Sequence, residues 1–132
     1  KSFYLDELGK EHIVLFAAED SWITDTQAFQ THAKATLNIT CLEPSQVFCI
    51  SSKQKEALCA GLHKMEHFFR KKTTEGYISM QRRIQCLISH SASERYRHLI
   101  ETQPNLIQRV PKSMIASFLG VSRETLSRLP AY

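Results

Sequence analysis

The 132 residues predict an α+β chain made of a partial antiparallel β roll, a long central helix and a C-terminal helix-turn-helix. Three observations lead to this fold class. Apolar residues favour short strands up to residue 50, and the apolar period becomes helical from about Ser52. Near the C-terminus, a small residue, a glycine and a leucine follow one another at helix-turn-helix spacing. The expected parts are residues 1–58, 59–90 and 91–132.

The composition is that of a folded globular protein, since 42% of the residues are hydrophobic and 23% are charged. This excludes disordered and fibrous chains. No run of about 18 apolar residues occurs, and the first residues lack the apolar stretch of a signal peptide. Four cysteines without a CxxC pair indicate reduced thiols rather than disulfides. We therefore expect a cytoplasmic protein with no membrane partner.

The charge is divided unevenly along the chain. Residues 1–58 contain five lysines and no arginine against eight acidic residues, a net charge of −3. Residues 59–132 contain four lysines and eight arginines against five acidic residues, a net charge of +7. A basic, arginine-rich second half is typical of a chain that meets a polyanion, and it suggests two modules.

The first part is predicted to consist of strands. Residues 3–5 and 12–16 are β-prone and flank a turn that contains Gly9, which predicts a hairpin. Two more β-prone runs, 36–42 and 46–50, follow on either side of a proline-containing turn. So few strands do not close a roll or sandwich, so we expect the β domain to continue beyond this sequence.

Helices are predicted from about Ser52 onward. A short helix capped by Ser52 precedes a long helical stretch that runs to about Ser89, and a further helix is expected at 93–102, capped by Ser93. Apolar residues in the long stretch repeat at heptad-like spacing, which predicts a dimer interface. The alternative is an intramolecular packing face. The predicted interface comprises Met65, Phe69, Tyr77, Met80, Ile84 and Leu87.

Residues 110–128 contain the strongest motif of the chain. Pro111 suits the start of a first helix, Gly120 allows a sharp turn, and Ser122 is a good N-cap for a second helix. Ala116 is small where two crossing helices approach each other, and Leu126 supplies the buried side of the second helix. This spacing predicts a helix-turn-helix.

The second helix of this motif has a polar face suited to DNA. N-terminal residues of a recognition helix meet base edges, where Arg123 matches guanine O6 and N7 and Glu124 matches cytosine N4. The hydroxyl side chains and Lys112 suit phosphates. One alternative is a solvated helix face with an incidental Arg-Glu pair. Another is a protein-interaction or dimerisation module whose winged helix does not bind DNA. The predicted DNA contacts are Lys112, Ser122, Arg123, Glu124, Thr125, Ser127 and Arg128.

Residues 120–128, Gly-Val-Ser-Arg-Glu-Thr-Leu-Ser-Arg, resemble the recognition helix of the Crp/Fnr family of bacterial transcription regulators. The rest of the chain is similar to that family in order: a cyclic-nucleotide-binding-like β roll, a long dimerisation helix and a winged helix-turn-helix. The resemblance implies a homodimer on near-palindromic double-stranded DNA, with RNA polymerase as a further partner. It also implies that Arg123, Glu124 and Arg128 read a half-site, and that further strands and a C-terminal wing lie outside these residues.

The same resemblance implies where an effector would bind. In nucleotide-binding members the pocket holds Gly-Glu and, later, Arg-Ser or Arg-Thr. The corresponding pairs here are Thr24-Asp25 and Ala35-Thr36. The arginine that pairs with phosphate is missing, and Lys34 is a shifted, weaker substitute. We therefore expect an unidentified effector other than cyclic AMP, contacting Thr24, Asp25, Lys34 and Thr36, and we assign no cofactor.

Three other features have less specific interpretations. Residues 63–67 read HxxEH, which on a helix presents two zinc ligands and a general base. No clear third ligand accompanies them, so we expect solvated histidines or an adventitious metal site, and no enzyme. Cys41 and Cys49, in predicted neighbouring strands, are either a redox pair or buried thiols. Trp22 and Phe29 either form an apolar small-molecule site or belong to an ordinary core.

Overall fold

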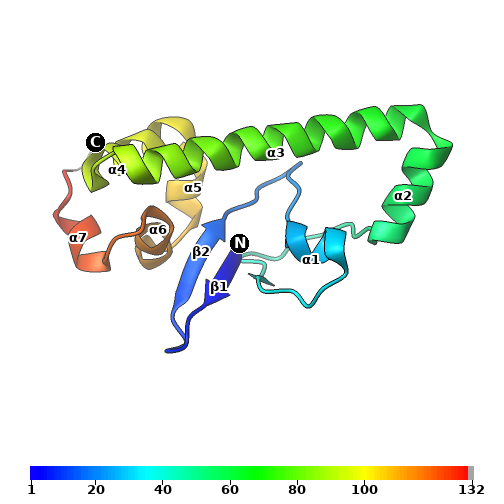
Figure 1. Cartoon of the computed structure of the whole chain (residues 1–132). Helices are drawn as coiled ribbons and strands as arrows, with labels where there is room; N and C mark the ends of the chain where they lie inside the picture. Colours follow the sequence, from blue (N-terminus) through cyan, green and yellow to red (C-terminus); the bar gives the residue numbers. More distant parts are fainter. Residues whose placement is uncertain (131–132) are drawn as a thin grey trace.

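The computed structural model describes residues 1–130. Within that range the chain is α+β and mostly helical, with seven helices and one three-stranded antiparallel sheet. The helix α3 (His63–Ser89) spans 27 residues, with α2 (Ser52–Gly61) at one end and the C-terminal helices at the other (Figure 1). The predicted α+β class and the long central helix are confirmed, whereas a β roll is not seen in the described residues. None of the described helices combines the length and the apolar character needed to cross a membrane.

A hairpin and one short strand form the sheet. β1 (Ser2–Leu5) pairs antiparallel with β2 (Glu11–Leu15) and, on its other side, with β3 (Asn38–Ile39), so the strand order is β2-β1-β3. In the hairpin turn the Asp6 carboxylate accepts two backbone hydrogen bonds, and Gly9 has a φ of +76°. This local chemistry closes the turn, and the predicted strands at 3–5 and 12–16 are confirmed.

The other two predicted strands are largely wrong. Of residues 36–42 only Asn38 and Ile39 form a strand, and residues 46–50 form none. Val47 and Phe48 are 65% and 93% exposed, so no neighbouring strand covers this run. A β-prone sequence becomes a strand only where another strand satisfies its backbone. In the described part of the chain, the three strands therefore do not close into a roll.

The caps of α2 and α4 (Ala92–Thr102) lie earlier than predicted. Ser51, not Ser52, caps α2, and Ser91, not Ser93, caps α4. In each case the capping serine is the one followed three residues later by Gln or Glu, whose side chain bonds back to the cap. This reciprocal pair is a capping box, which satisfies two otherwise unpaired donors and so decides between neighbouring serines.

The remaining helices are α1 (Thr26–Thr31), α5 (Pro104–Arg109), α6 (Lys112–Leu119) and α7 (Arg123–Arg128). The hydrophobic core joins the hairpin to the helices at the C-terminal end, so it includes residues of both the first and the third predicted parts. The division into 1–58, 59–90 and 91–132 stays a prediction. The buried core residues are Phe3, Ile13, Leu99, Val110, Ile115, Ala116, Phe118, Leu119 and Leu126.

Side chains also connect the two parts. The Ser117 hydroxyl of α6 donates to the Glu11 carbonyl at 2.9 Å and accepts from the Ile13 N–H at 3.2 Å. β2 is an edge strand, so one side of its backbone has no neighbouring strand to bond with. The Ser117 hydroxyl bonds to backbone groups of β2 instead, and α6 lies beside β2 (Figure 1). At the end of α5, Arg109 forms bidentate ion pairs with both Glu19 and Glu43, which raise the pKa of the arginine.

Candidate nucleic-acid interface

A tight turn, from Gly120 to Ser122, joins α6 to α7. Gly120 ends α6 in the left-handed conformation, with φ 69° and ψ 34°, and its N–H donates to the carbonyls of Ala116 and Ser117. Ser122 then caps α7, because its hydroxyl accepts a hydrogen bond from the Thr125 N–H at 3.1 Å. Glycine adopts positive φ without steric cost, and serine is among the best N-caps. The predicted turn and cap are confirmed.

One side of α7 is buried and the other is exposed. Leu126 is 4% exposed and belongs to the core. Within residues 1–130, no hydrogen bond or ion pair holds the guanidinium groups of Arg123 and Arg128, so both are available to a ligand. The helix ends at Arg128, and Leu129 is extended because Pro130 follows it. The exposed residues of α7 are Arg123, Glu124, Thr125, Ser127 and Arg128.

The hydroxyl groups of this surface are engaged within the helix. The Ser122 and Thr125 hydroxyl oxygens lie 3.1 Å apart, and the Ser127 hydroxyl donates to the Arg123 carbonyl at 3.0 Å. A phosphate offers only acceptors, so the Ser127 hydroxyl must rotate away from its own helix to bind one. The phosphate contacts predicted for these three hydroxyl groups stay predictions. The phosphate contact predicted for Lys112, which is exposed at the start of α6, also stays a prediction.

The carboxylate of Glu124 is held in its ionised form. Its pKa lies below the usual range, because it accepts hydrogen bonds from its own backbone N–H and from Ser122, and Arg123 adds a favourable charge. An ionised carboxylate is a pure acceptor. That is the chemistry needed to bind the amino group of cytosine.

Two of the predicted effector residues, Asp25 and Thr36, are hydrogen-bonded to each other. Asp25 is buried and caps α1: one carboxylate oxygen accepts from the Ala28 N–H, and the other accepts from Leu37 N–H and from both the N–H and the hydroxyl of Thr36. These bonds, that of the Thr36 N–H foremost, lower the pKa of Asp25 to about 2. The acceptors of Asp25 are thus used within the chain, while Thr24 and Lys34 are exposed.

The predicted dimer interface divides into a covered and an open stretch. Phe69 is buried, with the Trp22 ring 5.3 Å away and the Lys55 ammonium 5.1 Å from its ring centre. Met65 is half-buried nearby. At this end of α3 the intramolecular alternative describes the packing. The residues further along remain exposed: Tyr77 at 70%, Met80 at 38%, Ile84 at 50% and Leu87 at 39%.

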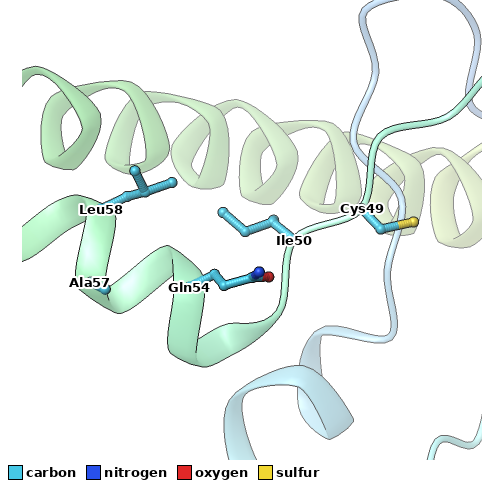
Figure 2. A pocket seen from close by; sticks show the side chains of 5 residues that line it. All are labelled: Cys49, Ile50, Gln54, Ala57 and Leu58. Atoms are coloured by element: carbon cyan, nitrogen blue, oxygen red, sulfur yellow. The ribbon is translucent and has the colours of Figure 1, made fainter.

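An apolar pocket lies next to α2, away from the predicted effector residues. Ile50 and Leu58 extend toward each other beside α2, with Cys49, Gln54 and Ala57 completing the lining (Figure 2). Trp22 and Phe29 do not line it. Trp22 packs against the Phe68 and Phe69 rings, and Phe29 lies beneath Lys55, which favours the packing interpretation of these two aromatics.

The histidines of the HxxEH motif and the two cysteines at 41 and 49 do not come together in a metal site among the described residues. His67 shares a hydrogen bond with the Arg70 guanidinium at 3.1 Å. No cluster of three or more His, Cys, Asp or Glu side chains suited to a metal occurs in the described range. Cys41 and Cys49 are exposed and lie outside any strand, so their predicted placement in neighbouring strands and the buried-thiol interpretation are wrong.

Comparisons of the chain with protein-family models, curated proteins and solved structures found no match. The resemblance to the Crp/Fnr family therefore rests on the sequence motif alone.

Proposed function

We propose that this protein is a sequence-specific, DNA-binding transcription regulator of the Crp/Fnr type. The observation that supports this best is the α7 surface, where Arg123, Glu124 and Arg128 are exposed while Leu126 anchors the helix in the core. A helix held in this way, after a left-handed glycine turn, has the form needed to enter the major groove.

In the complex, the first turn of α7 meets the base edges. Arg123 donates two hydrogen bonds to O6 and N7 of a guanine, and the ionised Glu124 accepts one from a cytosine amino group. Arg128 lies about one turn further on and completes the half-site contact. The net charge of +7 on residues 59–132 supplies the sequence-independent attraction to phosphates, which falls as salt rises.

The protein binds DNA as a homodimer in this proposal. The exposed apolar residues Tyr77, Met80 and Ile84 of α3 form the contact with a second copy. Two recognition helices then face half-sites about 34 Å apart on near-palindromic DNA. The three strands belong to a cyclic-nucleotide-binding-like β roll, and an effector other than cyclic AMP shifts how the central helices pair. RNA polymerase is the further partner.

A second candidate function is a protein-interaction module whose helix-turn-helix does not bind DNA. The exposed apolar residues on α3, with Tyr77 70% and Ile88 80% exposed, favour it, since such a stripe fits another protein as well as a second copy. The two candidates differ only in whether duplex DNA binds.

Fluorescence anisotropy with a randomised duplex pool, titrated with salt, tests the proposal. We expect affinity that falls steeply with salt and enrichment of a two-fold symmetric site. Arg123→Ala should weaken binding to the enriched site by about 1–3 kcal/mol and relax the preference at one position. Arg70→Ala removes the same charge toward the α2 end of α3 and should leave this preference intact.

Two results would contradict the proposal. Equal losses by Arg123→Ala on the enriched site and on random duplexes would exclude base reading by this side chain. Weak binding that does not respond to salt would contradict DNA binding by the chain without its effector and favour the interaction module.

A further inference from the structure

Arg83 of α3 holds the end of α6 in place. Its Nη2 donates to the Phe118 carbonyl at 2.8 Å and to the Ile13 carbonyl at 3.3 Å. The guanidinium carbon also lies 3.7 Å from the centre of the Phe118 ring, which is a cation–π contact. One side chain of the central helix thus joins α6 and β2.

The position of this contact on α6 is specific. The last carbonyls of a helix have no partner within it. The Gly120 N–H satisfies those of Ala116 and Ser117, and Arg83 satisfies that of Phe118. A cation at this end also complements the negative end of the helix dipole. The contact lies two residues before the glycine that sets the direction of α7.

Carboxylates do not explain why Arg83 lies here. Within residues 1–130 it forms no ion pair, and its burial lowers the pKa of the guanidinium. A partly desolvated cation is costly unless its donors are used. The carbonyls of Ile13 and Phe118 and the aromatic ring supply that compensation, so the guanidinium stays only where α6 and β2 are correctly placed.

A second contact of α3 falls on the turn itself. A β-carbon added to Gly120 would lie 3.8 Å from Leu87 Cδ2, so the Leu87 side chain borders the turn. Arg83 and Leu87 are four residues apart and therefore share one face of α3. Arg83 on this face contacts α6, and Leu87, about one helical turn later, borders Gly120 in the turn.

We propose that Arg83 is a positioning residue, which sets the direction of α7 relative to α3 without touching DNA. The inference rests on the proposed function, because it assigns to α3 the control of the DNA-binding helix. A movement of α3 then changes the direction of α7, because Arg83 connects α3 to the C-terminal end of α6.

The first test compares Arg83→Met with Arg82→Met, which removes the same charge from the exposed neighbouring residue. We expect Arg83→Met to weaken binding to the selected duplex about tenfold, which corresponds to one charge-assisted hydrogen bond. Its salt dependence should equal that of the wild type, because no phosphate contact is lost. Arg82→Met should retain wild-type affinity. Arg83→Lys keeps a cation for Phe118 and should lie between these values, and it replaces Arg83→Met if that variant does not fold.

Two binding results would overturn the proposal. Equal losses in the two methionine variants would mean a general effect of charge. A loss in Arg83→Met with a salt slope smaller by about one unit would mean that Arg83 contacts a phosphate directly.

The second test needs no DNA. The amides of Gly120 and Val121 bond to carbonyls of α6, so their hydrogen exchange reports on the turn. We expect exchange about tenfold faster in Arg83→Met than in Arg82→Met. Unchanged exchange would overturn the positioning role. If the wild type binds no duplex, the proposed function fails, while faster exchange at these two amides still supports Arg83 as the residue that positions the turn.

Discussion

Replacing Gly120 by alanine tests the geometry of the α6–α7 turn directly. The added β-carbon would meet only Leu87 Cδ2 at 3.8 Å, an ordinary van der Waals contact, so there is no steric penalty from neighbours. The cost is conformational, because an L-residue in the left-handed region loses about 1–2 kcal/mol. Alanine regains about 0.4–1 kcal/mol by restricting the unfolded chain. We therefore expect Gly120→Ala to destabilise the protein by about 1 kcal/mol.

Gly76 provides the matched control. It lies inside α3, its φ is not in the left-handed region, and no atom comes within 4 Å of an added β-carbon. Alanine is better than glycine in a helix interior by about 1 kcal/mol. Gly76→Ala should therefore stabilise the protein by about that amount, so the same chemical change has opposite signs at the two positions.

Urea unfolding followed by circular dichroism measures both variants. The midpoint should fall for Gly120→Ala and rise for Gly76→Ala at an unchanged slope. Gly120→Asn should recover part of the loss, since asparagine visits the left-handed region more readily than alanine. If Gly120→Ala stabilises the protein as Gly76→Ala does, residue 120 is not left-handed and the reasoning on the turn is refuted.

Three further predictions concern the rest of the chain. Asp25 has a folded pKa of about 2 against 3.8 in the unfolded chain, so its stabilisation is complete above pH 4 and is lost as pH falls toward 2. The stability difference between wild type and Asp25→Asn, from urea titrations at each pH, should shrink over that range; a constant difference would exclude the carboxylate as its source. Met80→Glu should produce monomers by light scattering, and Ser79→Glu should not; a dimer unchanged by Met80→Glu would place the interface elsewhere. Arg109→Met should be less stable than wild type at low salt, with a difference that declines as salt rises from about 0.05 to about 1 M, because both glutamate pairs are solvent-exposed and screened; a difference independent of salt would mean that packing is responsible.

The α6–α7 turn is predictable because its determinants are local. Gly120, Ser122 and Pro130 each act within a few residues of their own position: a left-handed glycine ends α6, a serine hydroxyl begins α7, and a proline stops it. Such residues adopt the same local geometry in many folds. The exposed face of α7 then follows from the helical period and the single buried Leu126.

The β-prone run at 46–50 shows that local sequence alone does not decide whether a strand forms. Its residues have the propensity for a strand, yet Phe48 is 93% exposed and no strand forms. Propensity describes what fits a sheet and does not say whether a neighbouring strand is present. Asp25 is similar in kind: its place before Thr26 is an N-cap signal, and its bonds to Thr36 and Leu37 depend on a loop that the period of the sequence does not reveal.

The packing of the hairpin against α6 is the feature that the sequence predicts least. The Ile13 N–H donates to the hydroxyl of Ser117, over 100 residues away along the chain, and the Ile13 carbonyl accepts from Arg83. The Ile13 side chain is 4% exposed, in the same core as Ile115. No pattern within the C-terminal residues encodes that contact, because a helix shows only that one face is apolar and not what covers it. The surface that α7 presents is thus a local feature, whereas its direction depends on the hairpin and on α3. Residues far from the proposed DNA contacts are therefore where substitutions should alter the direction of α7.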